Sequence, residues 1–298
     1  MNKIKQSMLS TVLFSLLLLA LAACQPIQQV AAPSGDAAVA NQTALSEAVF
    51  IAKEYSFEGP QSLSAGWTRI TLVNQGELAH DLMLFKVDDG KTIDDVMVAL
   101  DAEGIPEWAE FYGVLWGTTA DESGWFLTNL TPGTYVYLSF GEAEDAPPDA
   151  AQGMIATLTV TEAAEPVATE APIAADASIE LVNYQFVING VKAGDQVLRV
   201  SNSGDETHEV VFFRLKEGKT LADFQARLAL EMSDDPMPED AEEPADDVGG
   251  IFLSPGLVNY IPQTFEAGNY IFICFLPSPA HEMKAHFDLG MIQRVTIE

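Results

Sequence analysis

The feature that most constrains the fold of this chain is an internal repeat. Asn74-Gln75-Gly76 followed by His80 recurs as Asn202-Ser203-Gly204 followed by His208, at an offset of 128 residues. Three further pairs keep the same order: Gly90-Lys91-Thr92 with Gly218-Lys219-Thr220, Pro132-Gly133-Thr134-Tyr135 with Ala267-Gly268-Asn269-Tyr270, and Gly153-Met154 with Gly290-Met291. Separate matches in one order predict a tandem duplication, so we expect two units of one fold.

Composition places the boundaries of the two units. Residues 163–177 are rich in Pro, Ala and Glu, as in a linker, and residues 24–45 lack apolar periodicity, as in a flexible tether. We therefore expect a first domain at 46–162 and a second at 178–298. The stretch 231–247 is acidic and Pro-rich, which predicts a solvated loop, and it lacks the alternating pattern of a calcium-binding loop.

Each unit reads mainly as short β-strands. Alternating, β-branched stretches lie at 68–73, 135–138, 155–160, 197–200, 270–274 and 294–297, separated by Gly-containing turns. This pattern predicts an all-β chain of two antiparallel sandwiches. One helix is expected in each unit, because Thr92 with Asp95 and Thr220 with Asp223 match the spacing of a capping box.

The N-terminus predicts export. Lys3 and Lys5 precede an uncharged apolar run from Met8 to Leu21, which is the length of a signal peptide rather than of a membrane span. The following Leu-Ala-Ala-Cys24 resembles a bacterial lipobox, which implies lipid on Cys24 after removal of residues 1–23. We expect an extracytoplasmic protein held to a membrane by this lipid. An ordinary signal peptide with a chance cysteine, or a short membrane anchor, is the alternative.

Charge limits the partners. The chain carries 44 acidic and 14 basic residues, for a net charge of -30. Loss of residues 1–23 removes two lysines and no acid, which brings the charge to -32. Such a charge repels nucleic acid, so no nucleic-acid partner is expected.

The end of the second unit suggests a metal site. A strand bearing Cys274 is followed by a histidine-containing loop, Gly290-Met291 and a last strand, and His208 opens an earlier strand. This arrangement resembles the cupredoxins, the blue copper proteins. The resemblance implies two tandem Greek-key sandwiches, each with a short helical insertion. It also implies one copper ion held by His208, Cys274, His286 and an axial Met291.

Two points leave this ligand set open. Eleven residues separate Cys274 from His286, whereas in the family the two are usually a few residues apart. His281 is nearer to Cys274 and is the alternative to His286. Cys274 also lies in an apolar stretch, and free cysteine is often simply a buried core residue.

The first unit departs from the ligand pattern. It keeps His80 and Met154, but the repeat offsets place Ser139 at the cysteine position and Asp149 at the second histidine position. A hydroxyl does not replace a thiolate in a soft metal site, so we expect no type 1 copper in this unit. All four tryptophans lie here, which favours packing over a sugar- or partner-binding surface.

Two functions remain open from the sequence. The first is an electron carrier or copper-handling protein with a redox protein as partner. The second is a metal-free binding or interaction module on the same fold. An enzyme is not expected, because the chain lacks the Gly-x-Ser-x-Gly and metalloprotease motifs and four histidines are too few for a multicopper oxidase.

Overall fold

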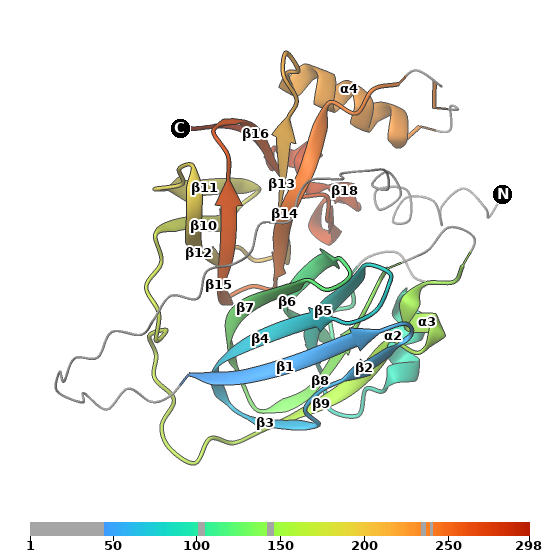
Figure 1. Cartoon of the computed structure of the whole chain (residues 1–298), viewed down its shortest axis with the longest axis vertical. Coiled ribbons are helices and arrows are strands. Elements are labelled where there is room, and N and C mark those ends of the chain that lie inside the picture. The colour runs from blue at the N-terminus through green and yellow to red at the C-terminus, as the bar shows by residue number, and fades with distance from the viewer. Residues whose placement is uncertain (1–44, 101–104, 142–145, 234–236, 239–240) are drawn as a thin grey trace.

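The computed structural model describes residues 45–100, 105–141, 146–233, 237–238 and 241–298 (Figure 1). The predicted signal peptide at 1–23, the predicted lipid site Cys24 and the tether up to residue 44 lie outside the described residues. Within the described part, no helix is both long and apolar enough to cross a membrane.

The first unit is a sandwich of two sheets, drawn in blue to green in Figure 1. One layer consists of β1 (Ser46–Lys53), β2 (Ser56–Glu58), β4 (Gly66–Asn74) and β7 (Ser123–Leu130). The facing layer consists of β3 (Ser62–Ser64), β5 (His80–Val87), β6 (Ala109–Thr118), β8 (Gly133–Leu138) and β9 (Ile155–Thr161).

The second unit repeats this plan, in yellow to red in Figure 1. Its first layer consists of β10 (Ala177–Val182), β11 (Gln185–Asn189), β12 (Gly194–Asn202) and β15 (Val258–Phe265). Its second layer consists of β13 (His208–Leu215), β14 (Ala245–Leu253), β16 (Gly268–Ile273) and β19 (Ile292–Ile297). A small hairpin of β17 (Pro277–Ser278) and β18 (Lys284–Ala285) lies between β16 and β19.

Most neighbouring strands of the described residues pair antiparallel, as the sequence predicts, but three pairs are parallel. The first strand of each unit pairs in parallel, β1 with β4 and β10 with β12, and β3 pairs in parallel with β9. Parallel neighbours need a crossover of about a dozen residues, and short hairpin strands occupy that stretch in both units. Alternation within a strand cannot distinguish the two pairings, since it reports only which face is buried.

The helices begin where their caps predict. In α4 (Leu221–Glu231), Thr220 and Asp223 exchange side-chain and backbone hydrogen bonds as a capping box. Thr92 and Asp95 exchange the same bonds ahead of α2 (Ile93–Leu100). A further four-residue helix, α3 (Asp149–Gln152), was not expected. The acidic loop predicted at 231–247 ends before residue 247, because β14 begins at Ala245.

The two units share one continuous sheet. β15 of the second unit pairs with β7 of the first, which joins the two first layers into eight strands. Asn259 donates from Nδ2 to the carbonyl of Tyr112 at 2.6 Å, beside Gly113. A Cβ on Gly113, whose φ is +149°, would lie 2.7 Å from that amide, so this close approach requires glycine. The units therefore pack as one body, with a main core that spans both.

Candidate metal centre

Four predicted site residues come from three parts of the second unit. His208 is the first residue of β13, and Cys274 directly follows β16. His286 begins the short 3-10 helix η2 (His286–Leu289), and Met291 lies just before β19. All four are buried, with exposed fractions of 0 or 1%.

The structure brings three of these side chains to one point. One potential ligand atom from each of His208, Cys274 and His286 lies within 4.8 Å of the others. Nδ1 of His286 is 2.9 Å from Nδ1 of His208 and 3.3 Å from Sγ of Cys274. Two imidazole nitrogens and a thiol therefore face one another in a buried site.

Backbone hydrogen bonds hold the loop that carries these residues. Cys274 donates its N–H to the carbonyl of Met291 at 3.0 Å, and Met291 donates to the carbonyl of His286 at 2.9 Å. His286 donates to the carbonyl of Leu276 at 2.8 Å. After Leu276 the chain thus forms the β17–β18 hairpin, and it returns to the base of the loop at His286. The eleven-residue separation is accommodated as an insertion that does not displace the histidine.

His281, the alternative ligand, lies outside this group. Its Nδ1 is 3.0 Å from both the Tyr184 hydroxyl and Oγ of Ser278, and the residue is exposed. Met291 is completely buried, and its backbone carbonyl accepts the N–H of Cys274.

The Asn-x-Gly turn before His208 has a local reason. Asn202 accepts the N–H of Gly204 at Oδ1 and donates from Nδ2 to the carbonyls of Glu206 and Leu253. A Cβ on Gly204 would lie 2.9 Å from Nε2 of His208, so a larger residue would press on the ring. The motif therefore fixes the approach of the chain to His208.

Burial sets the protonation of the group. Burial, together with the neighbouring His286 ring, lowers the pKa of His208 to about 4. Burial also lowers the pKa of His286 and raises the pKa of the Cys274 thiol well above its usual value. Neutral imidazoles are the form that binds metals, and a bound cation would displace the thiol proton.

Two residues around the group were missed from the sequence. Glu206 lies 2.8 Å from Nε2 of His286 through its Oε2, and the Tyr184 ring packs edge-on against His286 at a centroid distance of 5.1 Å. In so acidic a chain a single glutamate carries little information. The repeat offered one signal, because Leu78 stands at the position of Glu206 in the first unit.

The first unit reproduces the backbone frame but keeps only His80 and Met154 of the four candidate ligands. Ser139 donates its N–H to the carbonyl of Met154, Met154 donates to Asp149 and Asp149 to Gly141, as do the equivalent residues of the second unit. Oδ2 of Asp149 lies 2.8 Å from both Nδ1 of His80 and Oγ of Ser139. In the first unit a carboxylate thus stands at the position of the His286 imidazole and bonds both His80 and Ser139.

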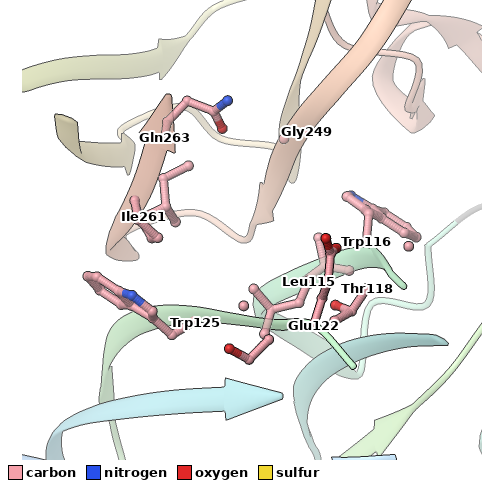
Figure 2. Close-up of a pocket in the computed structure, with 14 residues that line it drawn as sticks. Leu115, Trp116, Thr118, Glu122, Trp125, Gly249, Ile261 and Gln263 are labelled. Atoms are coloured by element: carbon pink, nitrogen blue, oxygen red, sulfur yellow. The ribbon is translucent and has the colours of Figure 1, made fainter. Parts of the chain in front are cut away.

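A cleft of about 240 Å³ lies between the units, away from the His–Cys–His group. Figure 2 shows Trp116 and Trp125 on opposite sides, with Leu115 and Glu122 between them and Ile261 and Gln263 of the second unit facing them. Both tryptophans are partly buried, and Arg69 lies 4.5 Å from the Trp125 ring centroid. Among the described residues that line this cleft there is no histidine or cysteine.

Several solved structures are similar to parts of this chain. Over 40% of its length the chain is similar to 98% of a reduced auracyanin from the photosynthetic bacterium Roseiflexus castenholzii, at 17% identity and a TM-score of 0.28. Auracyanin B matches over 41% of the chain and 94% of its own, at 26% identity and a TM-score of 0.28. No protein-family model matches the chain, and no curated protein matches it in sequence. Both units are all-β sandwiches, as the sequence predicts.

The prediction that the chain is not an enzyme is contradicted by two further matches. A multicopper oxidase is similar over 85% of the chain and 88% of its own length, at 15% identity and a TM-score of 0.22. A blue copper oxidase from Nitrosomonas europaea matches over 85% of the chain and 84% of its own, at 14% identity and a TM-score of 0.22. The expectation of no enzymatic activity is therefore withdrawn.

Proposed function

We propose that the chain is a lipid-anchored, extracytoplasmic protein that binds one copper ion in its second unit and uses it for electron transfer. The observation that carries this proposal is the convergence of His208, Cys274 and His286 within 4.8 Å in a buried site. These residues would hold the ion, and the thioether of Met291 would be a fourth, weaker donor.

The donor set fits copper. Thiolate and thioether favour Cu(I), and imidazole serves both oxidation states, so bound copper would supply a one-electron couple. Nδ1 of His286 lies 2.9 Å from Nδ1 of His208 and 3.3 Å from the sulfur, so the three donors converge. The first unit lacks this set, which supports one ion per chain.

Electron transfer is favoured over copper delivery by the rigidity of the site. The ligands are buried, and the loop between Cys274 and Met291 is held by backbone hydrogen bonds. Delivery requires ligands that exchange readily, whereas an electron carrier works best when little moves as the electron arrives. A redox protein is the proposed partner.

The site can be tested on the soluble chain that begins after Cys24. We expect one copper per chain after addition of Cu(II) and dialysis, with strong absorbance in the middle of the visible range that disappears on reduction and returns on oxidation. Reduction should leave the copper bound. A colourless protein that releases all copper on dialysis would leave the metal-free binding module as the function.

The anchor rests on the N-terminal sequence and has a separate test. The full chain should fractionate with membranes and carry lipid on Cys24, and Cys24→Ala should leave it with an uncleaved signal and without lipid. Mass spectrometry of the N-terminal peptide distinguishes these products. An unmodified Cys24 in the mature wild-type protein would refute the anchor and leave the copper site untouched.

A further inference from the structure

His286 is held at both of its ring nitrogens. Nδ1 faces His208 and Cys274, and Nε2 lies 2.8 Å from Oε2 of Glu206. The His286 side chain is completely buried, whereas that of Glu206 is 19% exposed. The carboxylate therefore covers the edge of the ring that faces away from the candidate ligands.

Glu206 is itself fixed from two directions. Its backbone carbonyl accepts from Asn202 Nδ2 at 2.9 Å, in the turn that leads to His208. Its Oε1 accepts from Ser278 Oγ at 3.0 Å and from the N–H of Ala280 at 3.3 Å, both in the insertion. One carboxylate thus joins the turn before the first histidine to the loop before the second.

The tautomer of His286 follows from this contact. A carboxylate can only accept a hydrogen bond, so the proton of the neutral ring lies on Nε2. Nδ1 then carries the lone pair, and it is the nitrogen that faces the sulfur. Carboxylates that orient a metal-binding histidine in this way also raise its basicity.

The first unit provides an internal contrast. Leu78 stands where Glu206 does, and Asp149 stands where His286 does. That unit has no second imidazole to orient, and it has no carboxylate at this position. The backbone of the turn is nevertheless the same, because Asn74 Nδ2 donates to the carbonyl of Leu78 at 2.6 Å.

We infer that Glu206 is a positioning residue of the metal centre, which fixes the ring and tautomer of His286 and closes its outer edge. This inference rests on the proposed copper site. Loss of such a carboxylate costs about 10- to 100-fold in metal affinity in comparable sites. We expect a loss of that size in Glu206→Leu, which installs the residue of the first unit and should leave the turn intact.

The experiment compares Glu206→Leu with Asp205→Asn in the soluble chain after Cys24. Asp205 is the exposed neighbouring residue, so its substitution removes one negative charge beside the site. The first measurement needs no metal: ¹⁵N shifts of the histidine side chains report the His286 tautomer in the metal-free protein. The second is the Cu(II) dissociation constant by competition with a chelator, and circular dichroism checks the fold of both variants.

The expected result is a ring protonated on Nε2 in the wild type and in Asp205→Asn, and a mixed or Nδ1-protonated ring in Glu206→Leu, with weaker copper binding only there. An unchanged tautomer and an affinity equal to that of Asp205→Asn would overturn the inference. Absence of copper binding by the wild type would instead refute the proposed function. The tautomer measurements would still show whether Glu206 fixes the His286 ring.

Discussion

Sγ of Cys274 lies 3.3 Å from Nδ1 of His286, although eleven residues separate the two in the chain. Hydrogen bonds from His286 to Leu276 and from Phe287 to Cys274 close the loop at its base. The intervening residues form a hairpin of their own. Loop closure becomes only slowly more costly with length, so the insertion is compatible with a fixed site.

Cys274→Ser should abolish visible absorbance and copper retention and leave the fold intact. A hydroxyl is a poor ligand for a soft site. Serine should be tolerated, because Ser139 occupies this position in the first unit and accepts the N–H of Asp81 as Cys274 accepts that of Glu209. We expect a change of about 1 kcal/mol in the free energy of unfolding, measured in urea. Copper content equal to wild type would refute the assigned site.

Separate alanine substitutions of His281 and His286 should have unequal effects. His286→Ala removes an imidazole of the buried group, so copper retention and colour should be lost. His281→Ala breaks contacts with Tyr184 and Ser278 in the insertion and should retain the colour. Absorbance and metal content after dialysis check both variants. Equal losses in the two variants would leave the choice of His286 over His281 unsupported.

The repeat made much of this architecture predictable. The offset of 128 residues placed His208 at a strand start, and the capping boxes placed two helices. The resemblance paired Cys274 with His286, but the sequence could not decide between His286 and His281. That choice depends on hydrogen bonds at the base of a loop whose own sequence gives no register. Glu206 was not predicted either, since its role arises from the insertion that folds against it.

The first unit should gain a copper site by two substitutions. Its backbone hydrogen bonds match those of the second unit, and His80 and Met154 are already buried in place. Ser139→Cys with Asp149→His would supply the missing thiolate and imidazole. We expect a second copper per chain, held more weakly because Leu78 provides no carboxylate.

Metal analysis and titration of the visible absorbance give the stoichiometry of that double variant. Asp149→His alone is the matched control and should add no coloured site, since the thiolate is still missing. If the double variant still binds one copper while the second unit stays loaded, matching backbones do not suffice to build the centre.

Asp81→Asn tests a buried carboxyl in the first unit. Asp81 is 4% exposed and accepts the N–H of Gly117. Burial, with the nearby charge of Asp149, raises its pKa from 3.8 to about 6, although hydrogen bonds and His80 act in the opposite direction. The folded state then binds more protons than the unfolded state between these values, so this group lowers stability as the pH rises from about 4 to about 6.

Between pH 4 and pH 7, the free energy of unfolding of the variant should gain about 1–3 kcal/mol relative to wild type. Urea titrations across this pH range measure the gain, and Asp205→Asn is the exposed control. Parallel pH profiles of unfolding free energy for Asp81→Asn and wild type would contradict the raised pKa of Asp81.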